Sequence, residues 1–134
     1  MSKSLIQVVN TTSQTLAAGS AISLGTAVRR YGCNCRLNGN AVEVSGEGYY
    51  KIDATVTIAP TATGNVQAAI YVNGVLLSGT LSTASVSTAN NAVTLPIIGT
   101  IRQACCCDSA DNITLVLVSG AGVVSNVALR VEKS

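Results

Sequence analysis

The chain has 134 residues and a formal net charge of +2, and only 10% of its residues are charged. This length is typical of one domain, so we predict that residues 1–134 form a single one. The net charge is small, and the sequence has neither a basic stripe nor a set of stacking aromatic residues. These features argue against binding to nucleic acid or to an anionic membrane.

A long central stretch is uncharged. Residues 54–101 contain no Asp, Glu, Lys, Arg or His, whereas about a quarter of the residues in soluble domains are charged. A monomer with so few charges would have a poorly soluble surface. We therefore expect an oligomer that hides part of this surface; the alternative is a monomer coated with Ser, Thr and Asn.

The sequence shows no targeting or membrane-spanning segment. The apolar run of residues 5–9 is interrupted by Gln7 and is far too short for the core of a signal peptide. The uncharged central stretch is broken by Pro60 and by several glycines, so it does not predict insertion into a bilayer. We expect synthesis in a bacterial cytoplasm without a signal peptide.

The first part of the chain predicts short strands separated by polar turns. We expect strands at residues 4–10, 21–24, 26–31 and 41–44, with a polar loop over residues 11–20. A second loop, residues 32–40, carries Cys33 and Cys35.

The clearest strand pattern lies between residues 49 and 58. One face carries Tyr50, Ile52, Ala54, Val56 and Ile58, and the other carries Tyr49, Lys51, Asp53, Thr55 and Thr57. This alternation is typical of an antiparallel strand with one buried face. Pro60 should end the strand, because proline has no N–H to donate to the ladder.

A second alternating strand follows and ends in a tight turn. Val66, Ala68, Ile70 and Val72 share one face, and Gln67, Ala69 and Tyr71 share the other. Asn73-Gly74 then predicts a hairpin, because a type I′ turn requires positive φ at both central residues.

The last part of the chain continues the same pattern. We expect strands at residues 75–77, 80–89, 92–102, 113–118 and 123–132, with Pro96 indicating an edge strand or a bulge. The loop of residues 103–112 carries three more cysteines. Eight to ten short strands at regular spacing predict an all-β antiparallel sandwich or jelly roll.

Five cysteines and no histidine leave several interpretations open. The cysteines are Cys33, Cys35, Cys105, Cys106 and Cys107. Four thiolates could bind zinc, but these spacings lack the two or more intervening residues of zinc knuckles. Disulfides within or between protomers are a second interpretation, and the odd count leaves at least one thiol unpaired within a protomer. Free thiols are the third, and we predict no cofactor.

Polar loops provide candidate ligand-binding residues. Asp108 and Asp111 offer carboxylate oxygens, but their surroundings lack the alternating ligands, central Gly and final Glu of an EF-hand. We interpret this segment as a polar turn. In a carbohydrate-binding module, Arg102, Asp108 and Asp111 would belong to a set of apical loops at residues 32–40, 80–91 and 103–112.

The sequence lacks the residues and motifs that are typical of common catalytic sites. There is no histidine to act as a base, no Gly-x-Ser-x-Gly elbow and no glycine-rich phosphate loop. We predict a protein that is not an enzyme.

Several short motifs resemble a known family. Val42-x-Val44, Gly48-Tyr49-Tyr50-Lys51-Ile52 and Tyr71-Val72-Asn73-Gly74 resemble the jelly-roll domains of the tumour necrosis factor superfamily and of the complement globular head. Tyr50-Lys51-Ile52-Asp53, together with the cysteines after Arg102, is similar to small phage and bacterial members. The chain departs from the animal members, which are rich in Phe and Trp, and from the spore-surface members, which have a collagen-like stalk.

The resemblance implies a ten-strand jelly roll, a tight homotrimer and a role in surface display or attachment. We expect the outward face of the two central strands to meet neighbouring protomers, because it is unusually uncharged. The residues predicted at this trimer interface are Tyr49, Thr55, Thr57, Ala69 and Tyr71. Ordinary exposed tyrosines are the alternative.

The leading functional hypothesis is a phage head fibre, decoration or receptor-binding domain located on the virion or another extracellular surface. Its partners would be its own copies, other particle proteins and a cell-surface glycan or receptor. Three alternatives remain: a carbohydrate-binding surface module, the head domain of a spore-surface protein, and an intracellular protein that binds a metal through its thiols.

Overall fold

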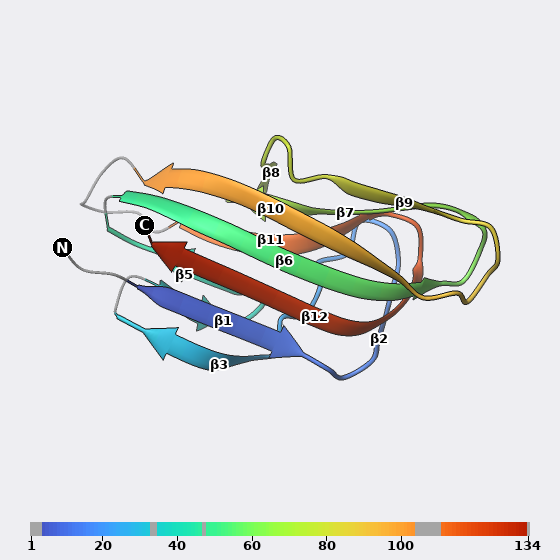
Figure 1. The fold of residues 1–134 in the computed structure, drawn as a ribbon, viewed down its shortest axis with the longest axis horizontal. Coiled ribbons are helices and arrows are strands. Elements are labelled where there is room, and N and C mark those ends of the chain that lie inside the picture. The colour runs from blue at the N-terminus through green and yellow to red at the C-terminus, as the bar shows by residue number, and fades with distance from the viewer. Residues whose placement is uncertain (1–3, 33–34, 47, 104–110, 134) are drawn as a thin grey trace.

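The computed structural model describes residues 4–32, 35–46, 48–103 and 111–133 as a two-layered β-sandwich (Figure 1). In these residues the strands are β1 (Leu5–Asn10), β2 (Gln14–Leu16), β3 (Thr26–Tyr31), β4 (Cys35–Asn38), β5 (Ala41–Val44), β6 (Gly48–Pro60), β7 (Gly64–Val72), β8 (Val75–Leu76), β9 (Ser82–Val86), β10 (Val93–Gln103), β11 (Asp111–Ser119) and β12 (Gly122–Lys133). The same residues include no helix long and apolar enough to cross a membrane.

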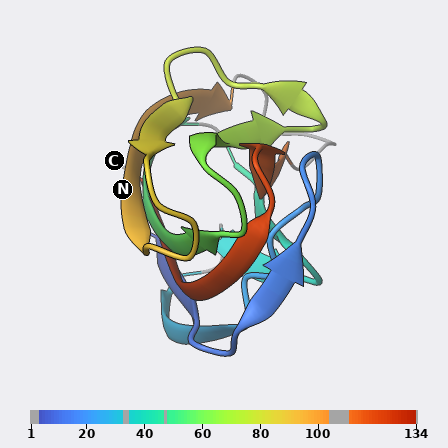
Figure 2. The ribbon, with the colours of Figure 1, turned by 90° about the vertical axis from the view of Figure 1, so that its right-hand side faces the viewer.

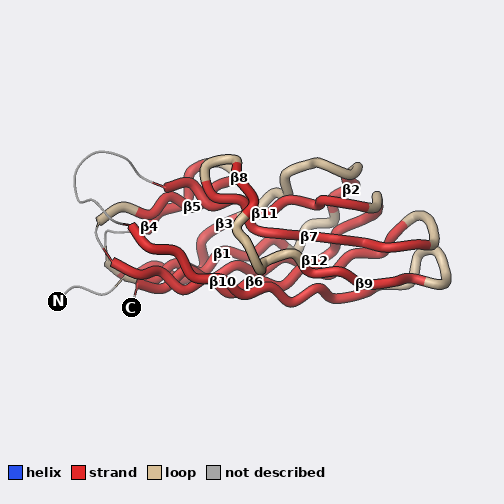
Figure 3. Tube along the Cα trace, turned by 90° about the horizontal axis from the view of Figure 1, so that it is seen from above, coloured by secondary structure: helices blue, strands red, loops and turns tan. Residues whose placement is uncertain are grey.

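All strand pairs are antiparallel, and the strands form two sheets. Sheet A has the order β10-β6-β12-β1-β3, and β2 also pairs with β12. Sheet B has the order β4-β5-β11-β7-β8, and β9 also pairs with β7. Figure 3 shows the two layers from above. The predicted all-β jelly roll is therefore confirmed.

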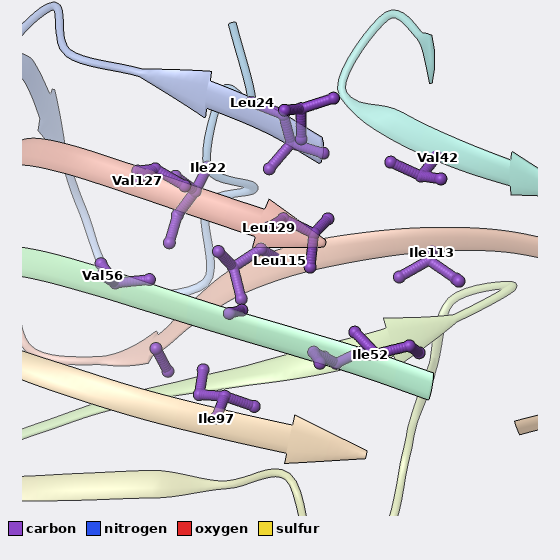
Figure 4. Close-up of a cluster of buried hydrophobic side chains, with 14 of the residues drawn as sticks. Ile22, Leu24, Val42, Ile52, Val56, Ile97, Ile113, Leu115, Val127 and Leu129 are labelled. Carbon is purple, nitrogen blue, oxygen red and sulfur yellow. The ribbon is translucent and has the colours of Figure 1, made fainter. Parts of the chain in front are cut away.

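The core lies between the two sheets and is built almost entirely from aliphatic side chains (Figure 4). All five residues predicted on the inner face of β6, from Tyr50 to Ile58, are buried. The Tyr50 hydroxyl lies within hydrogen-bond distance of two carbonyl oxygens, at 2.7 Å from Ser45 and 2.9 Å from Gly46. A polar atom buried at this end of the core is thereby satisfied.

The predicted hairpin at Asn73-Gly74 is present. Its flanking strands pair as Val72 with Val75 and Tyr71 with Leu76. Asn73 has a φ of 54° and Gly74 a φ of 83°, as a type I′ turn requires. The interpretation of Pro96 as an edge residue is also confirmed, because β10 is the outermost strand of sheet A.

Three details of the predicted strands are wrong. Residues 11–20 contain β2 and residues 32–40 contain β4, whereas both segments were expected to be loops. Residues 21–24 do not form a strand, and only Ala21 makes an isolated bridge, to Val116. Regular alternation over residues 123–132 would place Ser125 on the same face as Val127, but a bulge between Val124 and Asn126 shifts the register of β12, so Val124 is buried and Ser125 is exposed. Short and bulged strands lack the long alternation from which strands are predicted.

Ser4 and Lys133, the first and last described residues, lie together at one end of the sandwich, where the Lys133 N–H donates to the Ser4 carbonyl at 2.8 Å (Figure 1). The last residues of β3, β10 and β12 and the first residues of β6 and β11 lie there too. The opposite end carries the turns that join β6 to β7, β9 to β10 and β11 to β12 (Figure 2).

Candidate functional site

The outer face of sheet A brings together three of the predicted interface residues. Tyr49, Thr55 and Thr57 point outward from β6, between β10 and β12. Thr55 lies between Pro96 and Ala128, and Thr57 lies between Thr94 and Asn126. The half of the face that carries Thr55 and Thr57 is uncharged, as expected, whereas Tyr49 lies at the other end of β6, where it pairs with Arg102.

The other half of the same face carries charges of both signs, which the predicted uncharged face did not include. Asp53 lies between Ile98 and Arg130, and Lys51 lies between Thr100 and Glu132. Arg130 donates a hydrogen bond to Asp53 over 2.5 Å. This hydrogen bond, with the attraction of the Asp53 carboxylate, raises the pKa of Arg130. The opposite charges therefore neutralise one another within the face.

A shallow groove of about 290 Å³ lies where the two halves meet. Its lining residues are Gln7, Asp53, Ala54, Thr55, Pro96, Ile97, Ile98, Ala128, Leu129 and Arg130. Across the sheet, Thr55 and Ala128 form one row with Pro96, beside the row of Ile98, Asp53 and Arg130. The small side chains of Thr55 and Ala128 leave the surface lower than the larger side chains of the neighbouring row. Ile98 is 72% exposed, an unusual position for a large aliphatic residue, and it gives this groove an apolar wall.

Tyr49 and Arg102 form a contact at the terminal end of sheet A. The Arg102 guanidinium lies 5.9 Å from the centre of the Tyr49 ring, within the range of a cation–π interaction. Tyr49 remains 56% exposed. Arg102 was predicted in a ligand-binding loop, but it lies within β10.

Asp111 was predicted in the same set as Arg102, but it lies in sheet B. It begins β11 and accepts a hydrogen bond from the Asn73 side chain at 2.9 Å. The Asn73 carbonyl oxygen accepts a second bond, from the backbone N–H of Asn112, at 2.9 Å. Asp111 therefore helps to stabilise the β7–β8 hairpin. Asp108, which was predicted in the same loop, lies outside the described residues.

The apical loops predicted for ligand binding do not lie at one apex. The turn after β9 lies at the end opposite the chain termini, whereas β3 and β10 end beside the termini (Figure 1). The predicted set therefore draws on both ends of the sandwich, because period-two alternation gives no information about the end at which a loop emerges.

Ala69 and Tyr71 do not share a face with the β6 residues. They lie on β7 in sheet B, so the predicted single face across β6 and β7 is wrong. Ala69 is fully buried within the protomer, which removes it from any surface that could meet a neighbour. Tyr71 is partly exposed and pairs with Leu76.

Exposed apolar residues on β8, which pairs with Tyr71, and in the segment after β8 were not found from the sequence. Val75 is 69% exposed, Leu76 is 43% exposed and Leu81 is 44% exposed. β8 contains only two residues, too few for alternation to show which side chains face solvent. We call these three residues the β8 patch.

The β8 patch and the groove lie on either side of the β10 edge. The segment after β8 packs against β10 near Gly99, where a Cβ atom would lie only 2.9 Å from Thr80 and 3.0 Å from Leu77. Gly99 is adjacent in sequence to Ile98, which lines the groove. The two apolar surfaces are therefore neighbours on adjoining sides of the sandwich.

Of the five cysteines, the structure describes only Cys35, which is buried in the core. Burial raises the pKa of its thiol to about 11, although Arg30 and Lys133 act in the opposite direction. A thiol with so high a pKa is a poor nucleophile and a poor metal ligand at neutral pH. Cys33, Cys105, Cys106 and Cys107 lie outside the described residues. The described part of the chain contains no group of three or more residues arranged to bind a metal.

The fold is similar to several solved structures. Murine APRIL, at pH 5.0, superposes with a TM-score of 0.77 over 99% of this chain and 100% of its own, at 16% identity. The globular domain of zebrafish complement 1qA protein has a TM-score of 0.69 over 94% of both chains, at 6% identity. PRD1 vertex protein P5 has a TM-score of 0.63 over 97% of this chain and 96% of its own, at 12% identity.

These neighbours have the tumour necrosis factor and complement globular-head type of jelly roll, so the fold implied by the sequence motifs is confirmed. No family model and no curated protein sequence matches the chain.

Proposed function

We propose that this chain is a homotrimeric, non-catalytic structural or attachment protein of a phage particle. The observation that supports it best is the outer face of sheet A, with its groove and the exposed Ile98. An aliphatic side chain that is mostly exposed on a largely neutralised face gains free energy when another protein surface covers it.

Threefold assembly requires two different surfaces on each protomer, because a ring of three is built from heterologous contacts. The groove and the β8 patch provide such a pair. They lie on adjoining sides of one protomer, and this arrangement favours closure into a small ring over growth of an open filament. In the proposed trimer, Val75, Leu76 and Leu81 of one protomer face the groove of the next, and Tyr71 lies beside this contact.

Tyr49, Thr55 and Thr57 remain proposed interface residues on the groove side. Tyrosine suits such a position, since its ring provides apolar area and its hydroxyl can find a partner. Asp53 and Arg130 would enter the interface already paired, which lowers the cost of desolvating them.

The particle context is supported by the similarity in fold to PRD1 vertex protein P5. The proposed location is the virion, and the proposed partners are two further copies of the chain and other particle proteins. The sequence contains no histidine and few carboxylates, which favours a binding role over catalysis.

The test is native mass spectrometry of the wild-type chain and of Ile98→Glu. We expect a trimer for the wild type and dissociation for the variant, because a charge at the centre of an interface costs roughly 2 kcal/mol or more per contact. Thr63→Glu is the matched control, since Thr63 is exposed in the turn between β6 and β7, away from both surfaces. A trimer that survives Ile98→Glu would exclude this face from the interface.

A further inference from the structure

Charged residues are confined to one half of the sandwich, the half that carries both chain ends. Within the described residues they are Arg29, Arg30, Arg36, Glu43, Lys51, Asp53, Arg102, Asp111, Arg130, Glu132 and Lys133. The strand registers place them together: Arg102 pairs with Tyr49, Asp111 pairs with Val44, and Glu132 pairs with Lys51. Residues 4–28, 54–101 and 112–129 contain no charged side chain. The opposite half is built only from these stretches, although their ends also reach the charged half, where Leu5 pairs with Glu132 and Thr100 with Lys51.

At the opposite end three turns lie together and form a surface that we call the tip (Figure 2). β2 lies beside them, where Leu16 pairs with Gly122. The turns are residues 60–64, 87–92 and 119–122. They are rich in Ser, Thr, Asn and Gly and contain no aromatic residue. The side chains of Thr63, Thr88 and Asn91 are exposed there and make no hydrogen bond to the rest of the described chain.

Hydrogen bonds between the turns fix the shape of the tip. The backbone N–H of Thr61 donates to the carbonyl of Ala121 at 2.9 Å, and the N–H of Asn90 donates to the carbonyl of Pro60 at 2.7 Å. Asn90 adopts a φ of 70°, a left-handed conformation that non-glycine residues seldom adopt. Polar groups held on a rigid backbone lose little entropy when they bind a ligand.

We propose that the tip binds a neutral polysaccharide, an inference that rests on the proposed attachment function. Hydroxyl and amide groups exchange hydrogen bonds with uncharged sugars, and a neutral ligand needs no opposite charge. A polyanion or a polycation would find no ion partner in this half of the molecule. An apolar protein partner would require the aromatic or aliphatic anchors that dominate protein interfaces, and the tip has none.

The position of the tip fits this role. Both chain ends lie at the charged end, so a protomer attached to a particle by either terminus presents the tip outward. A trimer would present three tips to one repetitive polymer. Weak binding at each tip then combines into a stronger overall attachment.

The test is a binding measurement with the full chain on immobilised dextran, mannan and starch, with alginate as the acidic comparison, at low and at high salt. We expect retention on at least one neutral polymer that does not change with salt, because no ion pair contributes. The triple variant Thr63→Ala, Thr88→Ala, Asn91→Ala should weaken binding at least tenfold, since it removes three hydrogen-bonding groups.

Asn40→Ala is the matched control for Asn91→Ala. Asn40 is exposed in the turn between β4 and β5, outside the tip, and its replacement should leave binding unchanged. Retention on alginate alone, no retention on any neutral polymer, or full binding by the triple variant would overturn the proposal. The native mass of each sample separates the two hypotheses: a monomer that binds through the tip contradicts the trimer alone, and a trimer that binds none of the neutral polymers contradicts the tip alone.

Discussion

Cys35 shows how burial determines the chemistry of one residue. It pairs with Val44 on the neighbouring strand and is buried in the core. The core raises the pKa of the thiol, chiefly because a thiolate would lose its hydration there. A cysteine in this position acts as a small apolar residue.

This pKa shift predicts a loss of stability at alkaline pH. The thiol pKa is about 11 in the folded chain and 9.0 in the reference state, so the unfolded state releases its proton first. The Cys35 contribution is then fully present below about pH 9 and is lost as the pH rises toward 11. Urea unfolding from pH 8 to 11 should show a smaller decrease for Cys35→Val than for the wild type. Identical pH profiles would contradict the buried thiol.

A second prediction concerns the stability contributed by Tyr50, whose hydroxyl lies within hydrogen-bond distance of backbone carbonyls at the edge of the core. Tyr50→Phe keeps the ring and removes the contacts to the carbonyls of Ser45 and Gly46. The free energy of unfolding should fall by about 0.5–1.5 kcal/mol, measured by urea unfolding at one fixed chain concentration. A variant as stable as the wild type would show that these contacts contribute nothing.

At the scale of the element, the β7–β8 hairpin depends on Asn73. Its side chain bonds to Asp111 and to the N–H of Asn112, and its backbone is left-handed. Asn73→Ala loses both bonds and also places a Cβ-bearing residue without a polar side chain in that conformation. We expect a loss of roughly 1–3 kcal/mol in unfolding free energy.

Two further variants separate the contribution of the Asn73 hydrogen bonds from that of its backbone conformation. Asn73→Gly removes the bonds without the backbone penalty, so its loss should be smaller than that of Asn73→Ala. Asn40→Ala changes an exposed asparagine in another turn and should stay within about 0.5 kcal/mol of the wild type. If Asn73→Ala were no worse than Asn40→Ala, the bonds to β11 would not stabilise the hairpin.

The elements that could be predicted from sequence are the long ones with uninterrupted alternation. β6 and β7 were predicted with their buried faces, and the Asn-Gly turn was predicted with its type. β2 and β4 were missed because each is short and lies in a segment dominated by polar and turn residues. The bulge in β12 was missed because an extra residue leaves no mark on the local composition.

The candidate interface was only partly predictable. Alternation shows which residues share a face of one strand, but not which sheet the strand joins. Tyr49 and Tyr71 were therefore grouped together although β6 and β7 belong to opposite sheets. Ile98 was missed because four strands form the groove that it lines, and alternation within one strand does not show which strands lie together.

At the scale of the whole molecule, the separation of charge along the sandwich distinguishes two ends. The proposed trimer interface crosses the boundary between them, with paired charges on one side of the groove and uncharged residues on the other. Assembly should then depend mainly on apolar contact and only weakly on salt. A trimer that dissociates when the ionic strength is raised would indicate an electrostatic interface instead.

The most direct test of the trimer is sedimentation equilibrium of the wild-type chain over a wide range of concentrations. We predict a single species with a mass close to three times the 13.5 kDa of the chain, which persists on dilution because the interface is apolar. A species of 13.5 kDa at every concentration would contradict the assembly and, with it, the function proposed for the outer face of sheet A.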